Sequence, residues 1–292
     1  MPPLLLATFV LVLALAALVI VVLLRRRRRP GAPALPSVRA PESPALLVPR
    51  PGPALVLVHG ILGFDHIQLF GQRVAYFRGI AEALRAQGVT VHTPQLPPLA
   101  SVPARAEALT RFVSTLPSER VHLVAHSMGG LDARFALARL GLGERVASLV
   151  TVATPHRGTP LADLGAAVPL RALRSLVGRV GLATEAVDWL TTHRLDLFNR
   201  DIHDVPGVLY GCVVGRSAQR TLRVNPVLLS GHLYLSVRVG ANDGMVPADS
   251  QYWGEIFDEI EADHWAQVGW SSYFDAGAVY LRLYESLRQR GL

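Results

Sequence analysis

The sequence predicts an α/β protein with a mostly parallel, doubly wound sheet, preceded by an N-terminal transmembrane helix. From residue 54 onward, apolar runs of strand length alternate with helical patterns, which is typical of crossover units on a parallel sheet covered on both faces. One apolar run ends at a serine between small residues, a sign of a sharp turn from strand to helix. Residues 4–24 form one apolar run without charge, long enough to cross a bilayer as a helix.

Composition and charge limit the class of protein. The chain has 292 residues, half of them hydrophobic, which excludes a disordered chain and allows one large or two ordinary domains. The net charge is +7, but the five arginines at residues 25–29 leave only +2 for the rest, so no nucleic-acid partner is expected. The single cysteine, Cys212, cannot form an internal disulfide and lies in an apolar run, so we expect it in the core.

The N-terminal segment is predicted to be a single-pass membrane anchor spanning residues 1–29. A cleaved signal peptide would carry its positive charge before a shorter apolar core and end in a small-residue cleavage site, whereas here the arginines follow the core. The positive-inside rule then places these arginines, and the domain behind them, on the cytoplasmic side. Residues 30–53 are dense in Pro, Ala and Gly and are expected to form an extended linker.

The folded domain is predicted to span residues 54–292. We expect strands at residues 54–58, 89–93, 121–125, 146–153, 208–214, 233–239 and 255–260, and helices at residues 79–87, 104–116, 130–140 and 271–290. Residues 161–205 break this alternation with short amphipathic pieces, including 170–177 and 186–190. This stretch is expected to be either a helical cap or lid over the site, or a set of ordinary surface helices.

Ser127 is the candidate nucleophile, because it ends the run at residues 121–125 and precedes a helical pattern. Small residues two positions to either side, Ala125 and Gly129, let a strand and a helix pass closely at such a turn. The N–H of Met128, at the first helical turn, would supply one donor of an oxyanion hole. The alternative is a Ser-x-Gly turn without chemistry.

A serine hydroxyl needs a histidine as base and a carboxylate to orient that histidine. Where such a serine stands on a doubly wound sheet, the acid and then the histidine follow it along the chain. The histidines at a useful distance are His193, His203, His232 and His264. His264 is the predicted base, because it alone lies in a loop near the C-terminus after a strand-like run.

Asp243 is the predicted acid, because the Gly-rich turn at residues 240–247 presents a side chain at a strand end. Its rivals are Asp249, Asp258 and Asp263. Asp263 is adjacent to His264, and neighbouring side chains diverge, so we expect a solvated loop charge there. Asp243 as a simple turn former remains the alternative.

The second oxyanion donor is expected in the loop after the first strand, where His59 and Gly60 allow a tight turn and Ile61 presents its N–H. A plain strand-ending glycine is the alternative. His126 is expected to pack under the turn, on the side away from the chemistry. His156 either lines the mouth of a pocket or stabilises its own turn.

These segments together resemble the bacterial triacylglycerol lipases of the Pseudomonas and Burkholderia type. The resemblance rests on HGILGFD at residues 59–65, AHSMGG at 125–130, ATPHRGT at 153–159, FN at 198–199, ANDGMV at 241–246 and His264, in that order. It covers the chain from about residue 54 to the C-terminus and is weak through residues 161–205. It implies an α/β-hydrolase fold.

By this resemblance, the site would contain Ser127 as nucleophile, Asp243 as acid and His264 as base, with oxyanion N–H groups from Ile61 and Met128. The chain departs from the family at three points. Ala125 stands where these enzymes usually have glycine; Ala266 stands where an aspartate helps to hold a structural calcium; and the relatives are secreted, whereas this chain carries a predicted anchor. Because a hard cation needs several oxygen ligands, we predict neither this calcium site nor any cofactor.

The sequence therefore predicts a membrane-anchored serine hydrolase that cleaves carboxylic esters of lipids through an acyl-enzyme intermediate. Acylglycerols are the first candidate substrates, while phospholipid acyl chains and short soluble esters remain open. The alternatives are an acyltransferase or phospholipase with the same three residues, and a non-catalytic scaffold with the same fold.

Overall fold

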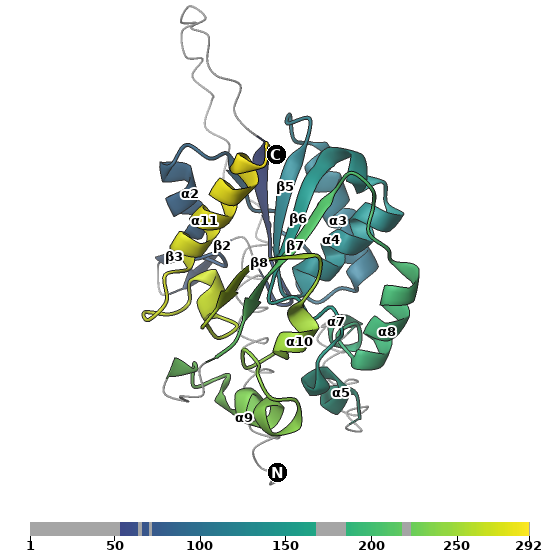
Figure 1. Ribbon diagram of the computed structural model, residues 1–292, viewed down its shortest axis with the longest axis vertical. Coiled ribbons are helices and arrows are strands. Elements are labelled where there is room, and N and C mark those ends of the chain that lie inside the picture. Colours follow the sequence, from purple (N-terminus) through teal and green to yellow (C-terminus); the bar gives the residue numbers. More distant parts are fainter. Residues whose placement is uncertain (1–52, 64–65, 70–71, 168–184, 218–222, 292) are drawn as a thin grey trace, which may run out of the picture.

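A computed structural model describes residues 53–63, 66–69, 72–167, 185–217 and 223–291 (Figure 1). Its centre is a six-stranded sheet in the order β4-β1-β5-β6-β7-β8, and every neighbouring pair is parallel. The strands are β1 (Ala54–Val58), β4 (Val91–His92), β5 (Val121–His126), β6 (Val146–Val152), β7 (Leu209–Gly215) and β8 (Glu255–Ile260). The α/β class and the parallel sheet predicted from the sequence are confirmed.

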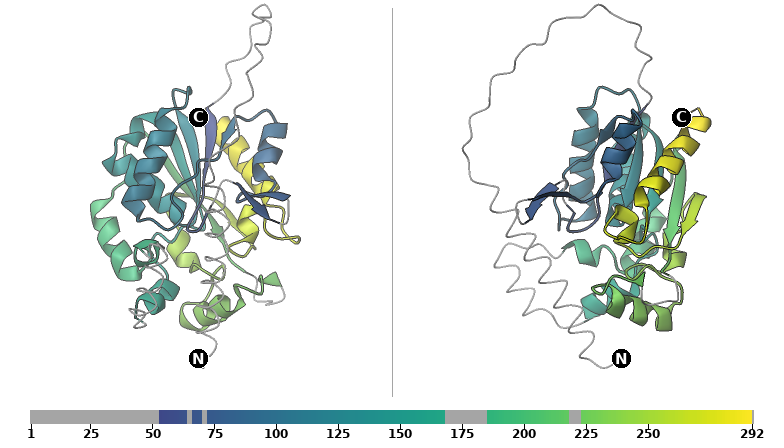
Figure 2. Two further views of the ribbon diagram at one scale, coloured as in Figure 1. Left: turned by 180° about the vertical axis from the view of Figure 1, so that it is seen from behind. Right: turned by 90° about the vertical axis from the view of Figure 1, so that its left-hand side faces the viewer.

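The central strands are mostly apolar, as expected for a parallel sheet that helices cover on both faces. All residues of β1, β5 and β6 are buried. On one face lie α3 (Val102–Ser114) and α4 (Met128–Arg139); on the other lie α2 (Ile80–Ala86) and α11 (Ala276–Gln289) (Figure 2). Each pair of helices closes its own hydrophobic core against the sheet.

One predicted strand is wrong. Residues 233–239 belong to α9 (Leu229–Arg238), although their apolar and polar residues alternate. The buried positions are Gly231, His232 and Leu235, which share one helical face, whereas Leu233 and Val237 are exposed. Two of the alternating apolar side chains, Leu233 and Val237, therefore face outward. The alternation does not mark the buried face of this segment.

A short hairpin of β2 (His66–Leu69) and β3 (Gln72–Ala75) follows β1 and was not predicted from the sequence. It is antiparallel and separate from the main sheet. Because it stands between the first strand and α2, the chain returns from it directly to Tyr76, beside the loop after β1.

The carboxyl ends of the strands all meet at the edge of the sheet where the smaller helices gather, at the lower end of Figure 1. These helices are α5 (Pro160–Ala167), α7 (Glu185–Asp188), α8 (Thr192–Asp201), α9 and α10 (Ala248–Gln251). The stretch at residues 161–205, expected to be either a cap or a set of ordinary surface helices, contains most of α5 and all of α7 and α8. The amphipathic piece expected at residues 170–177 lies outside the described residues. In parallel α/β sheets, ligands bind at this edge.

The described residues contain no helix that is both long and apolar enough to cross a membrane. The predicted anchor at residues 1–29 and the linker that follows lie outside the part of the chain that the structure describes, apart from Pro53 at the end of the linker. Both stay predictions.

Candidate active site

Ser127 stands at the sharp turn between β5 and α4, as the sequence predicts. Its backbone has φ 56° and ψ −131°, a conformation that costs a non-glycine residue about 1–3 kcal/mol. Two hydrogen bonds hold the turn: the Ser127 N–H donates to the Val152 carbonyl at 2.9 Å, and the Thr154 hydroxyl donates to the Ser127 carbonyl at 2.8 Å. The strained residue is therefore fixed from the neighbouring strand β6.

Gly129 shows why small residues flank the nucleophile. A Cβ atom at this position would lie 2.7 Å from the carbonyl oxygen of Val58 and 2.8 Å from that of His59. The helix α4 thus begins in direct contact with the end of β1, and only glycine fits. On the other side of the serine, the methyl group of Ala125 is fully buried in the core of the α3 and α4 face.

The structure brings Ser127, His264 and Asp243 together in one hydrogen-bonded row. His264 Nε2 lies 3.1 Å from Ser127 Oγ, and His264 Nδ1 lies 2.8 Å from Asp243 Oδ2. Because an ionised carboxylate only accepts, Nδ1 carries the ring proton and donates it to Asp243, which leaves Nε2 to accept from the Ser127 hydroxyl. All three residues are buried.

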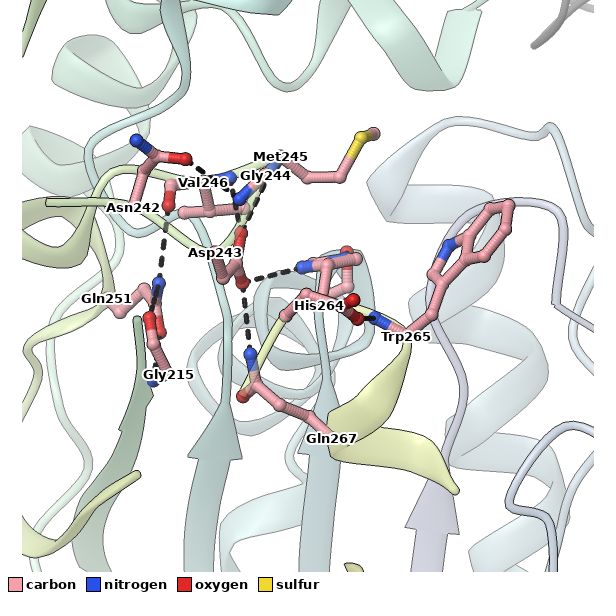
Figure 3. Close-up of polar contacts among 12 residues, drawn as sticks. Gly215, Asn242, Asp243, Gly244, Met245, Val246, Gln251, His264, Trp265 and Gln267 are labelled. Carbon is pink, nitrogen blue, oxygen red and sulfur yellow. Dashed lines mark hydrogen bonds and ion pairs between the residues drawn. The ribbon is translucent and has the colours of Figure 1, made fainter. Parts of the chain in front are cut away.

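Four hydrogen-bond donors contact the Asp243 carboxylate, namely His264 and three other groups (Figure 3). Oδ1 accepts from the N–H groups of Met245 and Val246 at 3.0 and 2.7 Å, and Oδ2 also accepts from Gln267 Nε2 at 3.1 Å. Donors of this number stabilise the charged carboxylate. Gln267 was not predicted, because no local pattern marks a glutamine as the partner of an aspartate 24 positions away.

Asp263 is buried, and the expectation of a solvated loop charge was wrong. Its Oδ1 accepts from the N–H groups of Trp265 and Ala266 at 3.0 and 2.8 Å, and its Oδ2 accepts from the N–H of Asn225 at 2.7 Å. Aspartate commonly bonds backbone amides two and three residues ahead, which closes a turn. This turn carries His264, so Asp263 fixes the loop of the candidate base.

The residues present do not fit the calcium site that the resemblance implies. Ala266 offers no side-chain oxygen, and both oxygens of the neighbouring Asp263 already accept backbone N–H groups. Across the described ranges, His, Cys, Asp and Glu form no group of three or more able to hold a metal. The turn that a cation would stabilise is closed here by hydrogen bonds from the chain itself.

The two candidate oxyanion donors are the N–H groups of Ile61 and Met128. Neither donates to an acceptor in the described part of the chain, so both are available to a bound oxygen. Arg105 Nη2 braces the loop before Ile61, because it donates to the carbonyls of His59 at 2.7 Å and Gly60 at 3.2 Å. Arg105 was not predicted from the sequence, since a single arginine in a helix is normally exposed.

The rival acids and bases lie elsewhere. Asp258 pairs with Arg282 on the surface, and Asp249 is exposed on α10. The other histidines that follow the nucleophile also stand away from it: His193 and His203 are exposed, whereas His232 Nδ1 donates to Asn242 Oδ1 at 3.0 Å.

His156 stabilises its own turn, which decides between the two predicted roles. It is fully buried, its Nδ1 accepts from Arg134 Nη1 at 3.3 Å, and its ring stacks on Trp253 with centroids 5.2 Å apart. Asn199 of α8 donates to the His156 carbonyl at 2.8 Å, which links α8 to the loop after β6. Burial and the nearby arginine charges lower the pKa of His156 well below its usual value.

Comparisons of sequence and fold relate the chain to known proteins. Residues 53–205 match the model of a family described as the alpha/beta hydrolase fold. Triacylglycerol lipase 2 of Saccharomyces cerevisiae is 27% identical over 248 residues, covering 75% of this chain and 74% of its own. Triacylglycerol lipases of Pseudomonas fragi and Burkholderia plantarii are 35% and 34% identical over 37% of this chain. Those two matches span only 36% and 31% of the bacterial lipases.

Among solved structures, the mature lipase BlEst2 of Bacillus licheniformis superposes with a TM-score of 0.66 at 22% identity. It covers 82% of this chain and 94% of its own. A metagenomic carboxyl esterase, MGS0156, gives a TM-score of 0.70 at 21% identity, over 90% of this chain and 82% of its own. These likenesses establish the fold, and the matched sequences of Pseudomonas and Burkholderia establish the resemblance found in the sequence.

Proposed function

Because the chain belongs to the alpha/beta hydrolase fold family, we propose that it is a carboxylic ester hydrolase that acts on lipid esters through an acyl-enzyme on Ser127. The observation that carries this proposal is the buried row Ser127, His264 and Asp243, with contacts of 3.1 and 2.8 Å. The triacylglycerol lipases among its relatives support the same reaction class. The relatives named triacylglycerol lipase make acylglycerols the first substrates to test.

In the first half of the reaction, Ser127 Oγ attacks the ester carbonyl carbon while His264 Nε2 takes the hydroxyl proton. The carbonyl oxygen becomes an oxyanion, which accepts from the N–H groups of Ile61 and Met128. Asp243 holds the Nδ1–H of His264 and stabilises the imidazolium. The tetrahedral intermediate then expels the alcohol, which receives the proton from His264, and the acyl group stays on Ser127.

In the second half, a water molecule gives a proton to His264 and attacks the acyl carbonyl. The same two N–H groups stabilise the second oxyanion. Collapse of this intermediate breaks the bond to Ser127 Oγ, which takes the proton back from His264, and the carboxylic acid leaves. The chain therefore ends the cycle in its starting protonation state.

The test compares Ser127→Ala with Ser114→Ala, an exposed serine on α3, in the full-length protein. We expect Ser127→Ala to lose hydrolysis of p-nitrophenyl esters by about a thousandfold or more, because the nucleophile is gone, while Ser114→Ala keeps wild-type activity. A fluorophosphonate probe should label the wild type on Ser127 alone. Retained activity in Ser127→Ala, or labelling at another residue, would contradict the proposal.

The same assay separates hydrolysis from acyl transfer. With an alcohol acceptor present, hydrolysis releases free acid, whereas an acyltransferase forms a new ester from the same acyl-enzyme. Phospholipids tested beside triacylglycerols divide a phospholipase from a lipase. A protein that neither reacts with the probe nor turns over any ester would be a scaffold with this fold.

We also propose that residues 1–29 anchor the protein in a membrane, with the catalytic domain on the cytoplasmic side. The uncharged apolar run followed by five arginines supports this topology. The full chain should sediment with membranes and resist extraction by carbonate, while a chain lacking residues 1–29 should not. If protease added outside sealed cells degrades the domain, the proposed orientation is wrong.

A further inference from the structure

Two residues outside the candidate triad, Tyr76 and His126, connect the loop after β1, which carries the candidate oxyanion donor Ile61, with the candidate base His264. The Tyr76 hydroxyl oxygen lies 3.3 Å from the Gly60 amide nitrogen and 2.8 Å from His126 Nδ1. On the other side of its ring, His126 Nε2 lies 3.1 Å from the backbone carbonyl oxygen of His264. The Gly60 N–H, the Tyr76 hydroxyl, the His126 ring and the His264 carbonyl thus form one continuous chain of hydrogen bonds.

The direction of each hydrogen bond follows from which atoms can donate. A carbonyl only accepts, so His126 Nε2 must carry the ring proton and donate it to His264. His126 Nδ1 is then bare and accepts from the Tyr76 hydroxyl, whose oxygen in turn accepts from the Gly60 N–H. Only one arrangement of protons satisfies all three bonds while the His126 ring is neutral.

Burial keeps that arrangement unchanged during the reaction. His126 has no exposed surface, and this desolvation, with the nearby charge of His264 as a smaller cause, lowers its pKa well below the usual value. Burial likewise raises the pKa of Tyr76. The centroid of the His126 ring also lies 4.6 Å from that of the His264 ring, so His126 contacts the base through its ring as well as through the carbonyl.

This chain of hydrogen bonds restrains Gly60, because the Tyr76 hydroxyl accepts from the Gly60 N–H. Arg105 Nη2 and the N–H of Gly63 bond the Gly60 carbonyl, while the Tyr76 hydroxyl bonds the Gly60 N–H. With both its groups held, Gly60 has little freedom in φ and ψ, and the N–H of the next residue, Ile61, keeps one direction. Gly60 also lies against the nucleophile, since a Cβ on it would come within 2.7 Å of Ser127 Cβ.

We propose that Tyr76 and His126 are positioning residues that tie the oxyanion donor at Ile61 to the base His264, so that both keep their alignment on Ser127. The inference rests on the proposed ester hydrolysis. It assigns a function to the histidine before the nucleophile and to the first residue after the β2-β3 hairpin.

The test uses Tyr76→Phe, which keeps the ring and removes only the hydroxyl, with Tyr273→Phe at an exposed tyrosine as the matched control. Activity is expressed per active site titrated with a fluorophosphonate, so that unfolded protein does not count. We expect Tyr76→Phe to lower kcat about tenfold or more with KM within about twofold, because a misaligned oxyanion donor affects the transition state and not substrate binding. Tyr273→Phe should match the wild type.

A boronic acid, which forms a tetrahedral adduct with the nucleophile, supplies a second readout. Its inhibition constant should rise in Tyr76→Phe in proportion to the loss of kcat/KM. His126→Phe should lose activity in the same way, and His126→Gln, whose amide keeps one donor and one acceptor, should recover part of it. If kcat per titrated site and boronic acid affinity in Tyr76→Phe and His126→Phe equal those of the wild type, the two residues only pack.

Nitrogen-15 spectra of the histidine-labelled wild type test the hydrogen bonds of His126 without any catalysis. They should place the His126 proton on Nε2, and removal of the Tyr76 hydroxyl should shift the Nδ1 resonance. A proton on Nδ1 would overturn the inference. A wild type without esterase activity would instead refute the proposed function, and the spectra would still decide whether the hydrogen bonds of His126 exist.

Discussion

The buried ion pair of Arg105 and Asp132 yields a prediction about stability and pH. Both side chains are fully buried, with Arg105 Nε 2.7 Å from Asp132 Oδ2. The second oxygen, Oδ1, has no hydrogen-bond partner among the described residues. Burial raises the pKa of Asp132 to about 7, although the charge of Arg105 acts to lower it. The perturbation is Asp132→Asn, which keeps an acceptor for Arg105 Nε and removes the titrating group.

The raised pKa makes the ion pair cost stability as the pH increases. Asp132 has a pKa near 3.8 in the unfolded chain and about 7 in the folded one. Between pH 3.8 and about pH 7, Asp132 holds a proton in the folded protein that it has released in the unfolded chain. The free energy of unfolding therefore falls as the pH rises. A pKa about 3 higher in the folded chain corresponds to up to about 4 kcal/mol. The variant lacks this loss.

Urea unfolding of wild type and Asp132→Asn from about pH 4 to about pH 8 measures the difference, since the linear extrapolation yields the free energy at each pH. We expect the two proteins to be similar at the acid end and the variant to become the more stable one near pH 8. The buried His126 and His156 act in the opposite direction, because their lowered pKa values cost stability as the pH falls below about 6.5. They are common to both proteins and cancel in the comparison. A variant that is less stable at every pH, with no trend, would refute the reasoning and mean that Arg105 keeps Asp132 ionised.

Four further predictions concern the site and its supports. Asp243→Asn should lower kcat about a thousandfold or more with little change in KM, because His264 then loses the partner that fixes its tautomer; an unchanged kcat would remove Asp243 from the triad. Asp263→Ala should lower the free energy of unfolding by about 2 to 4 kcal/mol, since three backbone N–H groups lose their acceptor. In urea titrations neither added calcium nor a chelator should alter the wild-type midpoint, and a calcium-dependent midpoint would contradict the turn as described. Gly129→Ala should lower stability by about 1 to 3 kcal/mol and reduce activity, because the new methyl meets the Val58 carbonyl; normal stability and activity would show that α4 shifts freely.

Much of the fold was predictable because its signals are local. The strands β1, β5 and β6 are mostly apolar, and β5 and β6 each lie within a few residues of a helical pattern. The failure at residues 233–239 has the same origin: alternation is a local signal, and only packing decides which side of α9 is buried. The β2-β3 hairpin was missed, since no clear alternation marks its two short strands.

By itself, the sequence predicted the α/β class, the turn at Ser127, and Asp243 and His264 as the candidate acid and base, because these predictions need only local residue types and their order along the chain. The tertiary structure alone decided what holds these residues in place. The strand order sets β1 beside β5 and β5 beside β6, which brings the loops after these strands to one edge. Only there does His126 meet a carbonyl 138 positions away. Contacts over such separations depend on the packing order of the strands, which no local pattern encodes.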